Sequence, residues 1–129
     1  MARSRSNLPT AGELAILRVL WTDGPSSVRE VHRILVKKRK IGYTTVLKLM
    51  QIMTEKGMIH VDKTVRPQLF EPTRSRNQTQ SQLVRDLLDR AFSGSAGSLI
   101  LQALSTKKAT PEERRQIREL LDRLEEDSE

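Results

Sequence analysis

Cysteine is absent from this sequence of 129 residues, and aromatic side chains make up only 3% of it. The lack of cysteine excludes disulfides, thiolate metal sites and cysteine nucleophiles, and it fits a reducing cytoplasm. The scarcity of aromatics means that a core must be built from aliphatic side chains and methionine. Such a thin core is marginal for one chain of this size. We therefore expect a second subunit to cover part of the apolar surface.

Long hydrophobic runs are also lacking. No apolar stretch approaches the ~20 residues that a membrane-spanning helix needs. The basic start, residues 1–7, lacks the apolar segment of a signal peptide. The sequence thus predicts a cytoplasmic protein without a membrane partner.

Charge is abundant and unevenly distributed. The net charge is +7, with 15 Lys and Arg against 6 Asp and Glu in residues 1–76, and 8 against 10 in residues 77–129. The first part is strongly basic and the second slightly acidic. This asymmetry favours a polyanionic partner for the basic part, although a well-solvated basic surface has the same composition.

Three helices are predicted in the basic part. Capping-box spacing at Thr10–Glu13 and at Ser27–Glu30 marks the starts of the first two, and apolar residues at helical spacing follow each start. A third helix is expected from about residue 44 to residue 56, before Gly57. Its inward stripe consists of Val46, Leu49, Met50 and Met53.

A β-hairpin and further helices complete the predicted fold. Residues 59–62 alternate as a strand does, and residues 69–71 are the expected antiparallel partner. We expect a mainly α fold with a small β-hairpin: a winged helix-turn-helix domain at residues 1–74 and a C-terminal helical dimerisation domain at residues 75–129. The residues expected at the dimer interface are Leu83, Leu87, Leu88, Ala91, Leu99, Ile100, Leu104, Leu120, Leu121 and Leu124. With Ile117, the leucines of the last helix form the side that we expect to be buried.

The polar side of the third helix predicts contacts with DNA. Thr44, Lys48 and Gln51 lie opposite the apolar stripe, and Thr45 lies beside them at the helix start. Threonine and lysine can contact base edges or phosphates in a major groove. An ordinary solvated face, with Thr44 only a cap, gives the same pattern. Because the third helix follows a turn and lies in the basic region, we favour contact with DNA over a merely solvated face.

Other side chains have two interpretations. Lys63 and Arg66 lie in the hairpin loop, where they either grip DNA as a wing or protect a strand edge by their charge. Tyr43 either points its hydroxyl at a phosphate or plugs the corner before the third helix.

Arg3 and Arg5 are predicted to follow the DNA backbone as an arm. Trp21, which ends an apolar stripe, is expected to pack in the core.

No pattern indicates catalysis. The two histidines, His32 and His60, have no Asp or Glu at ligand spacing, and there is no nucleophile elbow or phosphate-binding glycine loop. We expect no enzymatic activity, no cofactor and no metal site.

The combination of motifs resembles the penicillinase-repressor family (BlaI/MecI/CopY type) from about Leu8 to Leu124. The motifs that carry the resemblance are Leu8-Pro9-Thr10-x-x-Glu13, Leu20-Trp21, Val28-Arg29-Glu30-Val31, Gly42-Tyr43-Thr44-Thr45-Val46-Leu47, Lys56-Gly57, Phe70-Glu71-Pro72 and Phe92-Ser93-Gly94-Ser95. The resemblance implies a homodimeric winged-helix repressor of a palindromic DNA operator, controlling an operon of β-lactamase or stress-response type. It also implies that Tyr43, Thr44 and Thr45 open the recognition helix, and that the C-terminal helices interlock two chains.

The sequence departs from the family pattern in three places. Lys48 stands where the family usually has threonine, and Ile52 where it has arginine, which predicts a different operator sequence. Antibiotic-responsive members are inactivated by cleavage of an Asn-Phe bond, whose place Gln102-Ala103 takes here, so a sensor protease as partner would have to cut another bond. The cysteine-rich hook of copper-responsive members is absent.

Two alternative functions stay open. A winged helix can serve as a protein–protein module, in which case Leu47 and Ile52 would form an apolar docking patch. It can also bind structured RNA.

Overall fold

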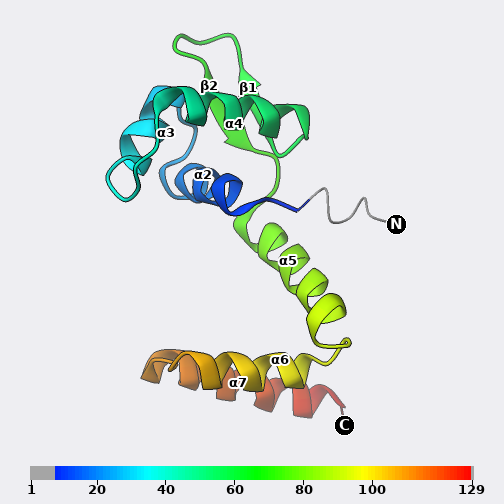
Figure 1. Ribbon diagram of the computed structural model, residues 1–129. Coiled ribbons are helices and arrows are strands. Elements are labelled where there is room, and N and C mark those ends of the chain that lie inside the picture. Colours follow the sequence, from blue (N-terminus) through cyan, green and yellow to red (C-terminus); the bar gives the residue numbers. More distant parts are fainter. Residues whose placement is uncertain (1–7, 129) are drawn as a thin grey trace. The chain divides into compact units, whose positions relative to one another are not determined.

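The computed structural model describes residues 8–128 of the chain (Figure 1). The elements are helices α2 (Ala11–Asp23), α3 (Val28–Leu35) and α4 (Tyr43–Glu55), strands β1 (Ile59–Asp62) and β2 (Leu69–Pro72), and helices α5 (Arg76–Ala91), α6 (Ala96–Thr106) and α7 (Pro111–Ser128). The predicted mainly α fold, with one small antiparallel sheet, is confirmed. Among residues 8–128, no helix combines the length and apolar character that crossing a bilayer requires.

Both capping boxes of the basic part are present. The Thr10 hydroxyl accepts from the Glu13 amide at 3.2 Å, and the Thr10 amide donates to the Glu13 carboxylate at 2.9 Å. Ser27 and Glu30 form the same pair of bonds at the start of α3. These bonds satisfy amides that the first turn of a helix leaves without partners.

Glu13 also holds α2 against the end of α4. Its side chain is only 2% exposed, and its second carboxylate oxygen lies 2.9 Å from Lys56 Nζ. A buried carboxylate needs such a partner, because burial without one is costly. The sequence spacing gave no sign of this ion pair.

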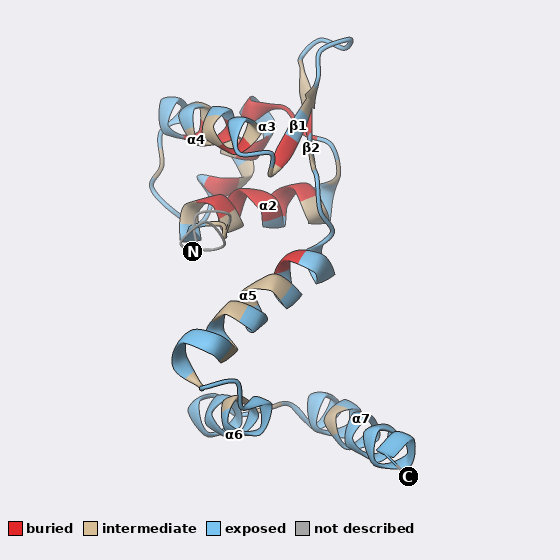
Figure 2. Ribbon diagram, turned by 90° about the vertical axis from the view of Figure 1, so that its right-hand side faces the viewer, coloured by how far each residue is buried: buried red, intermediate tan, exposed pale blue. Residues whose placement is uncertain are grey.

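The core lies among α2, α3, α4 and the hairpin (Figure 2). Ile16, Val31, Val46, Met50 and Met53 are fully buried, which confirms a core of aliphatic side chains and methionine. Burying one such side chain contributes roughly 1.5–3 kcal/mol. This core packs against one side of α4.

The hairpin is joined to the segment before α3. β1 and β2 pair antiparallel, with Ile59 opposite Pro72 and Asp62 opposite Leu69. Ser26 extends this sheet, because its amide donates to the Phe70 carbonyl at 3.2 Å and its carbonyl accepts from the Phe70 amide at 2.9 Å. A pairing of this length has no periodic signal, and sequence analysis did not find it.

Internal contacts divide the chain into two compact units, one up to Asp86 and one from Leu87. In the first unit, which we call the head, the beginning of α5 packs near the end of α2. Trp21 Nε1 donates to the Arg74 carbonyl at 3.0 Å, and Arg76 donates to the Thr22 hydroxyl at 2.9 Å. Trp21 is half-buried against the core, as expected. The domain boundary after residue 74 stays a prediction.

The second unit, which we call the C-terminal unit, contains the end of α5, then α6 and α7. Ser93 and Gly94 adopt positive φ values of 50° and 79°, which separates α5 from α6 where the sequence predicts a break. Thr110 and Glu113 form the predicted capping box of α7, with hydrogen bonds of 3.1 and 2.9 Å.

Side chains in α6 and α7 are not buried by the single chain. The expectation that the apolar side of α7 is buried is therefore wrong within one chain. Ile117 is half-buried, and Leu120, Leu121 and Leu124 are about half exposed. Periodicity identifies an apolar side of a helix, but it does not say whether the same chain covers it.

Candidate nucleic-acid interface

An open groove of about 790 Å³ runs between the start of α3, the outer side of α4 and the hairpin. Its lining includes apolar side chains of all three parts, Val28, Leu47 and Phe70. Three of the predicted DNA contacts meet there: Tyr43, Gln51 and Lys63. The groove thus brings together residues that are 20 positions apart in the sequence.

The outer side of α4 carries the remaining predicted reading residues. Thr44, Thr45 and Lys48 are all exposed. The helix begins one residue earlier than predicted, with Gly42 as its N-cap and no side chain bonded to its first amides. The alternative in which Thr44 is only a cap is therefore wrong. An uncapped helix start favours an external anion, because its amides and the helix dipole point toward it.

Tyr43 lies between two side chains of α3. Its ring meets the His32 ring edge-on, with 5.9 Å between the centroids, and the Arg29 guanidinium lies 5.8 Å from the Tyr43 centroid. His32 Nε2 lies 3.0 Å from the Ile41 carbonyl oxygen in the turn before α4. Tyr43 is 41% exposed, so it packs beside the turn with part of its side chain open to solvent, and both interpretations of Tyr43 stay predictions.

Arg29 and His32 are functional candidates that sequence analysis missed. Arg29 is exposed at the start of α3 and lines the groove. The available signal was a cation two residues after the Ser27 cap, in the first turn of α3, where the helix dipole disfavours positive charge. His32 joins the turn to Tyr43 and so helps to position the start of α4.

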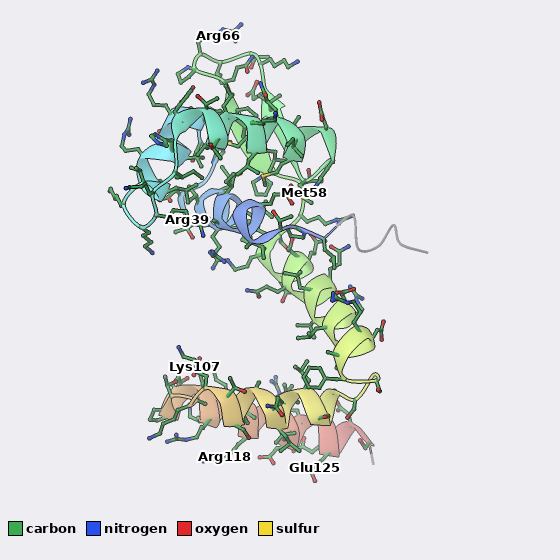
Figure 3. All side chains as sticks on the ribbon, in the orientation of Figure 1. Arg39, Met58, Arg66, Lys107, Arg118 and Glu125 are labelled. Atoms are coloured by element: carbon green, nitrogen blue, oxygen red, sulfur yellow. The ribbon has the colours of Figure 1, made fainter. Side chains whose placement is uncertain are left out.

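The hairpin loop is ordered by its own side chains. Asp62 accepts hydrogen bonds from the Thr64 hydroxyl and, at 2.9 Å, from the Thr64 amide, and these bonds hold the pKa of Asp62 below its ordinary value. Arg66 donates to the carbonyls of Lys63 and Val65 at 2.8 and 3.1 Å. Both Lys63 and Arg66 remain exposed, and Figure 3 labels Arg66 at the far end of the loop.

Two further expectations concern the N-terminal arm and metal binding. Arg3 and Arg5 lie outside the described residues, so the DNA-contacting arm stays a prediction. Within residues 8–128, no group of three or more His, Asp or Glu side chains is placed to hold a metal ion.

Comparison with known proteins decides the family. The model of the family described as penicillinase repressor matches residues 9–123. The chain belongs to the penicillinase repressor family. Two relatives named "Transcriptional regulator BlaI", from Mycobacterium tuberculosis strains CDC 1551 / Oshkosh and ATCC 25618 / H37Rv, are each 30% identical to the chain over 80 residues.

These matches cover 61% of this chain and 58% of each relative, so the chain spans less than two thirds of the relatives' length. The penicillinase repressor family consists of transcriptional regulators, which are not enzymes. The resemblance predicted from the motifs is confirmed, and a family of transcriptional regulators agrees with the expectation of no enzymatic activity.

Proposed function

We propose that the chain is a homodimeric transcriptional repressor that binds a palindromic operator in duplex DNA. The observation that carries the proposal is the outer side of α4, where an uncapped helix start and exposed Thr44, Thr45 and Lys48 stand beside an exposed hairpin loop. A major groove about 12 Å wide admits one helix. In each half-site, α4 lies in the major groove with its first turn toward the bases.

Base reading and phosphate binding fall to different residues. Thr44, Thr45 and Lys48 contact base edges, because threonine can both donate and accept and lysine can donate to guanine. Arg29 with Tyr43 binds phosphate where α3 borders the groove beside α4, and Lys63 with Arg66 binds it at the hairpin loop. The charge of residues 1–76 supplies affinity for any duplex, which weakens as salt rises.

Dimerisation is supported by apolar side chains that the single chain leaves uncovered. In the C-terminal unit, Leu101 is 70% exposed, and Leu120, Leu121 and Leu124 are close to 50% exposed. A monomeric protein rarely exposes such a series, and a second copy would cover it. A two-fold dimer presents two heads to two matching half-sites. We place this function in the cytoplasm; the sensor protease suggested by the family resemblance stays a prediction.

The alternative of a protein–protein module has less support. Leu47 and Ile52, which would form its docking patch, are both half-buried. Leu47 lines the groove beside α4, whereas Ile52 does not, so the two side chains do not form one docking patch there.

Lys48→Ala tests the proposed reading side. The operator is first selected from random duplexes, and affinity is measured by fluorescence anisotropy. We expect roughly tenfold weaker operator binding, since one base contact is worth about 1–3 kcal/mol, with an unchanged melting temperature because Lys48 is exposed. Lys108→Ala, an exposed lysine between α6 and α7, is the matched control and should bind normally.

Three results would contradict the proposal. Failure to select any duplex would exclude a sequence-specific operator. Equal operator affinity of the Lys48→Ala variant and the original chain would exclude the reading side assigned to α4. Displacement of the operator by a structured RNA at lower concentration than by duplex DNA would favour an RNA-binding function.

A further inference from the structure

A second cationic surface lies on the head, in the turn between α3 and α4. Lys37, Lys38, Arg39 and Lys40 follow α3, and all four are exposed. Figure 3 places Arg39 on the α2 side of the head, whereas Arg66 marks the hairpin end. Within residues 8–128, no carboxylate forms an ion pair with any of these four side chains.

A separate groove of about 440 Å³ lies next to this basic turn, between α2 and the second half of α3. Its apolar lining comes from Ala15, Val19, Ile34 and Leu35. Its charged lining comes from Arg18, Lys38, Arg39 and a single acidic residue, Asp23. It shares no lining residue with the groove beside α4.

The end of α3 does not by itself account for this charge. A cation near a helix C-terminus has a small stabilising effect, which is confined to the last turn. The Leu35 carbonyl already accepts from the amides of Lys38 and Arg39, at 3.0 and 3.1 Å. Adjacent like charges repel each other, so four in succession are better explained by an anionic partner.

We propose that this groove and the basic turn bind an acidic amphipathic segment of a partner protein. The cations select carboxylates by charge complementarity, and the apolar lining selects one or two apolar side chains on the same face of the segment. Phosphates of a duplex would use the cations but not the apolar lining. Because the two grooves are separate, the partner and DNA can occupy the head together. This proposal does not depend on DNA binding.

A synthetic peptide tests the chemistry of the partner. The probe is a fluorescein-labelled helix-forming peptide of roughly 16 residues, with leucines at helical spacing among glutamates. A second peptide keeps every glutamate and replaces each leucine with serine. We expect the full chain to bind the leucine peptide at least about tenfold more tightly, since burial of a leucine removes apolar surface from water. Equal binding of the two peptides would overturn the proposal.

Charge reversal tests the position of the site. Lys38→Glu with Arg39→Glu should weaken binding of the leucine peptide at least about tenfold, since it replaces two attractions with two repulsions. The matched control, Lys107→Glu with Lys108→Glu, reverses two exposed cations between α6 and α7 and should bind normally. Equal loss in both variants would show attraction by net charge alone and overturn the assigned site. Displacement of the peptide by a duplex would show a phosphate-binding surface instead.

Amide chemical shifts of the unmutated, isotopically labelled chain give an answer even if the charge-reversed variant unfolds. The leucine peptide should shift the signals of Val19, Ile34 and Arg39. Shifts at Leu47 and Val61, which line the groove beside α4, would place the peptide on the wrong surface and overturn the proposal.

Discussion

In the head, α2, α3 and α4 bury their leucines, valines and methionines against one another, and the hairpin closes the core with Ile59 and Phe70. In the C-terminal unit, α6 and α7 also carry aliphatic side chains at helical spacing, but they bury none of them. Both units show the same helical periodicity, so the difference lies in whether the covering surface belongs to the same chain. The head covers its apolar side chains within one chain, whereas α6 and α7 leave theirs exposed.

The strongest test of this comparison truncates one apolar side chain in each unit. Met50→Ala should cost about 2–5 kcal/mol of unfolding free energy, because it leaves a cavity in a packed core. Leu121→Ala should cost less than about 1 kcal/mol at low protein concentration, because the side chain is 50% exposed in one chain.

Urea unfolding at a series of protein concentrations separates the two cases. The cost of Met50→Ala should be independent of concentration, whereas that of Leu121→Ala should grow as dimers form. A Leu121→Ala cost as large as that of Met50→Ala in dilute solution would mean that α7 is packed within the monomer.

The next test concerns the partner of α7. Leu120→Ala with Leu124→Ala should raise the dimer dissociation constant at least about 100-fold, because large-to-small changes at a packed interface cost over 2 kcal/mol each. Asp122→Ala with Glu126→Ala changes the opposite side of the same helix, by helical spacing, and should leave the dimer intact. Sedimentation equilibrium measures both. Unchanged association of the double leucine variant would place the interface elsewhere.

A smaller effect distinguishes the two capping boxes of the head. Glu13→Gln should cost about 2 kcal/mol, because it breaks the ion pair of a buried carboxylate with Lys56. Glu30→Gln should cost less than about 1 kcal/mol, since the Glu30 carboxylate is exposed and its hydrogen bond is to the Ser27 amide at the helix cap. Thermal unfolding of the two variants measures the difference. Equal costs would show that the Lys56 ion pair adds nothing.

Lowering the pH should reveal how much the Glu30 carboxylate contributes to the stability of the head. The hydrogen bond from the Ser27 amide holds the Glu30 pKa below its ordinary value of 4.5. The carboxylate therefore stabilises the folded head fully above that value and loses its effect as the pH falls through the lowered pKa. The melting temperatures of the original chain and of Glu30→Gln, measured across this pH range, should converge in acid.

The parts of the structure that were predictable from sequence have local signals. The capping boxes at Thr10 and Ser27 fixed two helix starts, and alternation fixed the strands at residues 59–62 and 69–72. The start of α4 was placed one residue late because Gly42 offers no side-chain cap.

The contacts that were missed join residues far apart in the chain. Glu13 and Lys56 are 43 positions apart, and Ser26 pairs with Phe70. No local pattern identifies such partners, because they are set by how the helices pack. The same holds for the candidate site. The polar side of α4 was predictable from the sequence, but the contact of Arg29 with Tyr43 depends on how the helices pack.

The two backbone hydrogen bonds between Ser26 and Phe70 have a consequence for DNA recognition under the proposed function. They fasten the segment that leads into Arg29 to the strand that follows Lys63 and Arg66. Arg29 and the cations of the hairpin loop are therefore carried by segments that are hydrogen-bonded to each other. Under the proposed function, a duplex whose phosphates are spaced differently would not satisfy both sets of cations at once, and the head would select duplex shape as well as base identity.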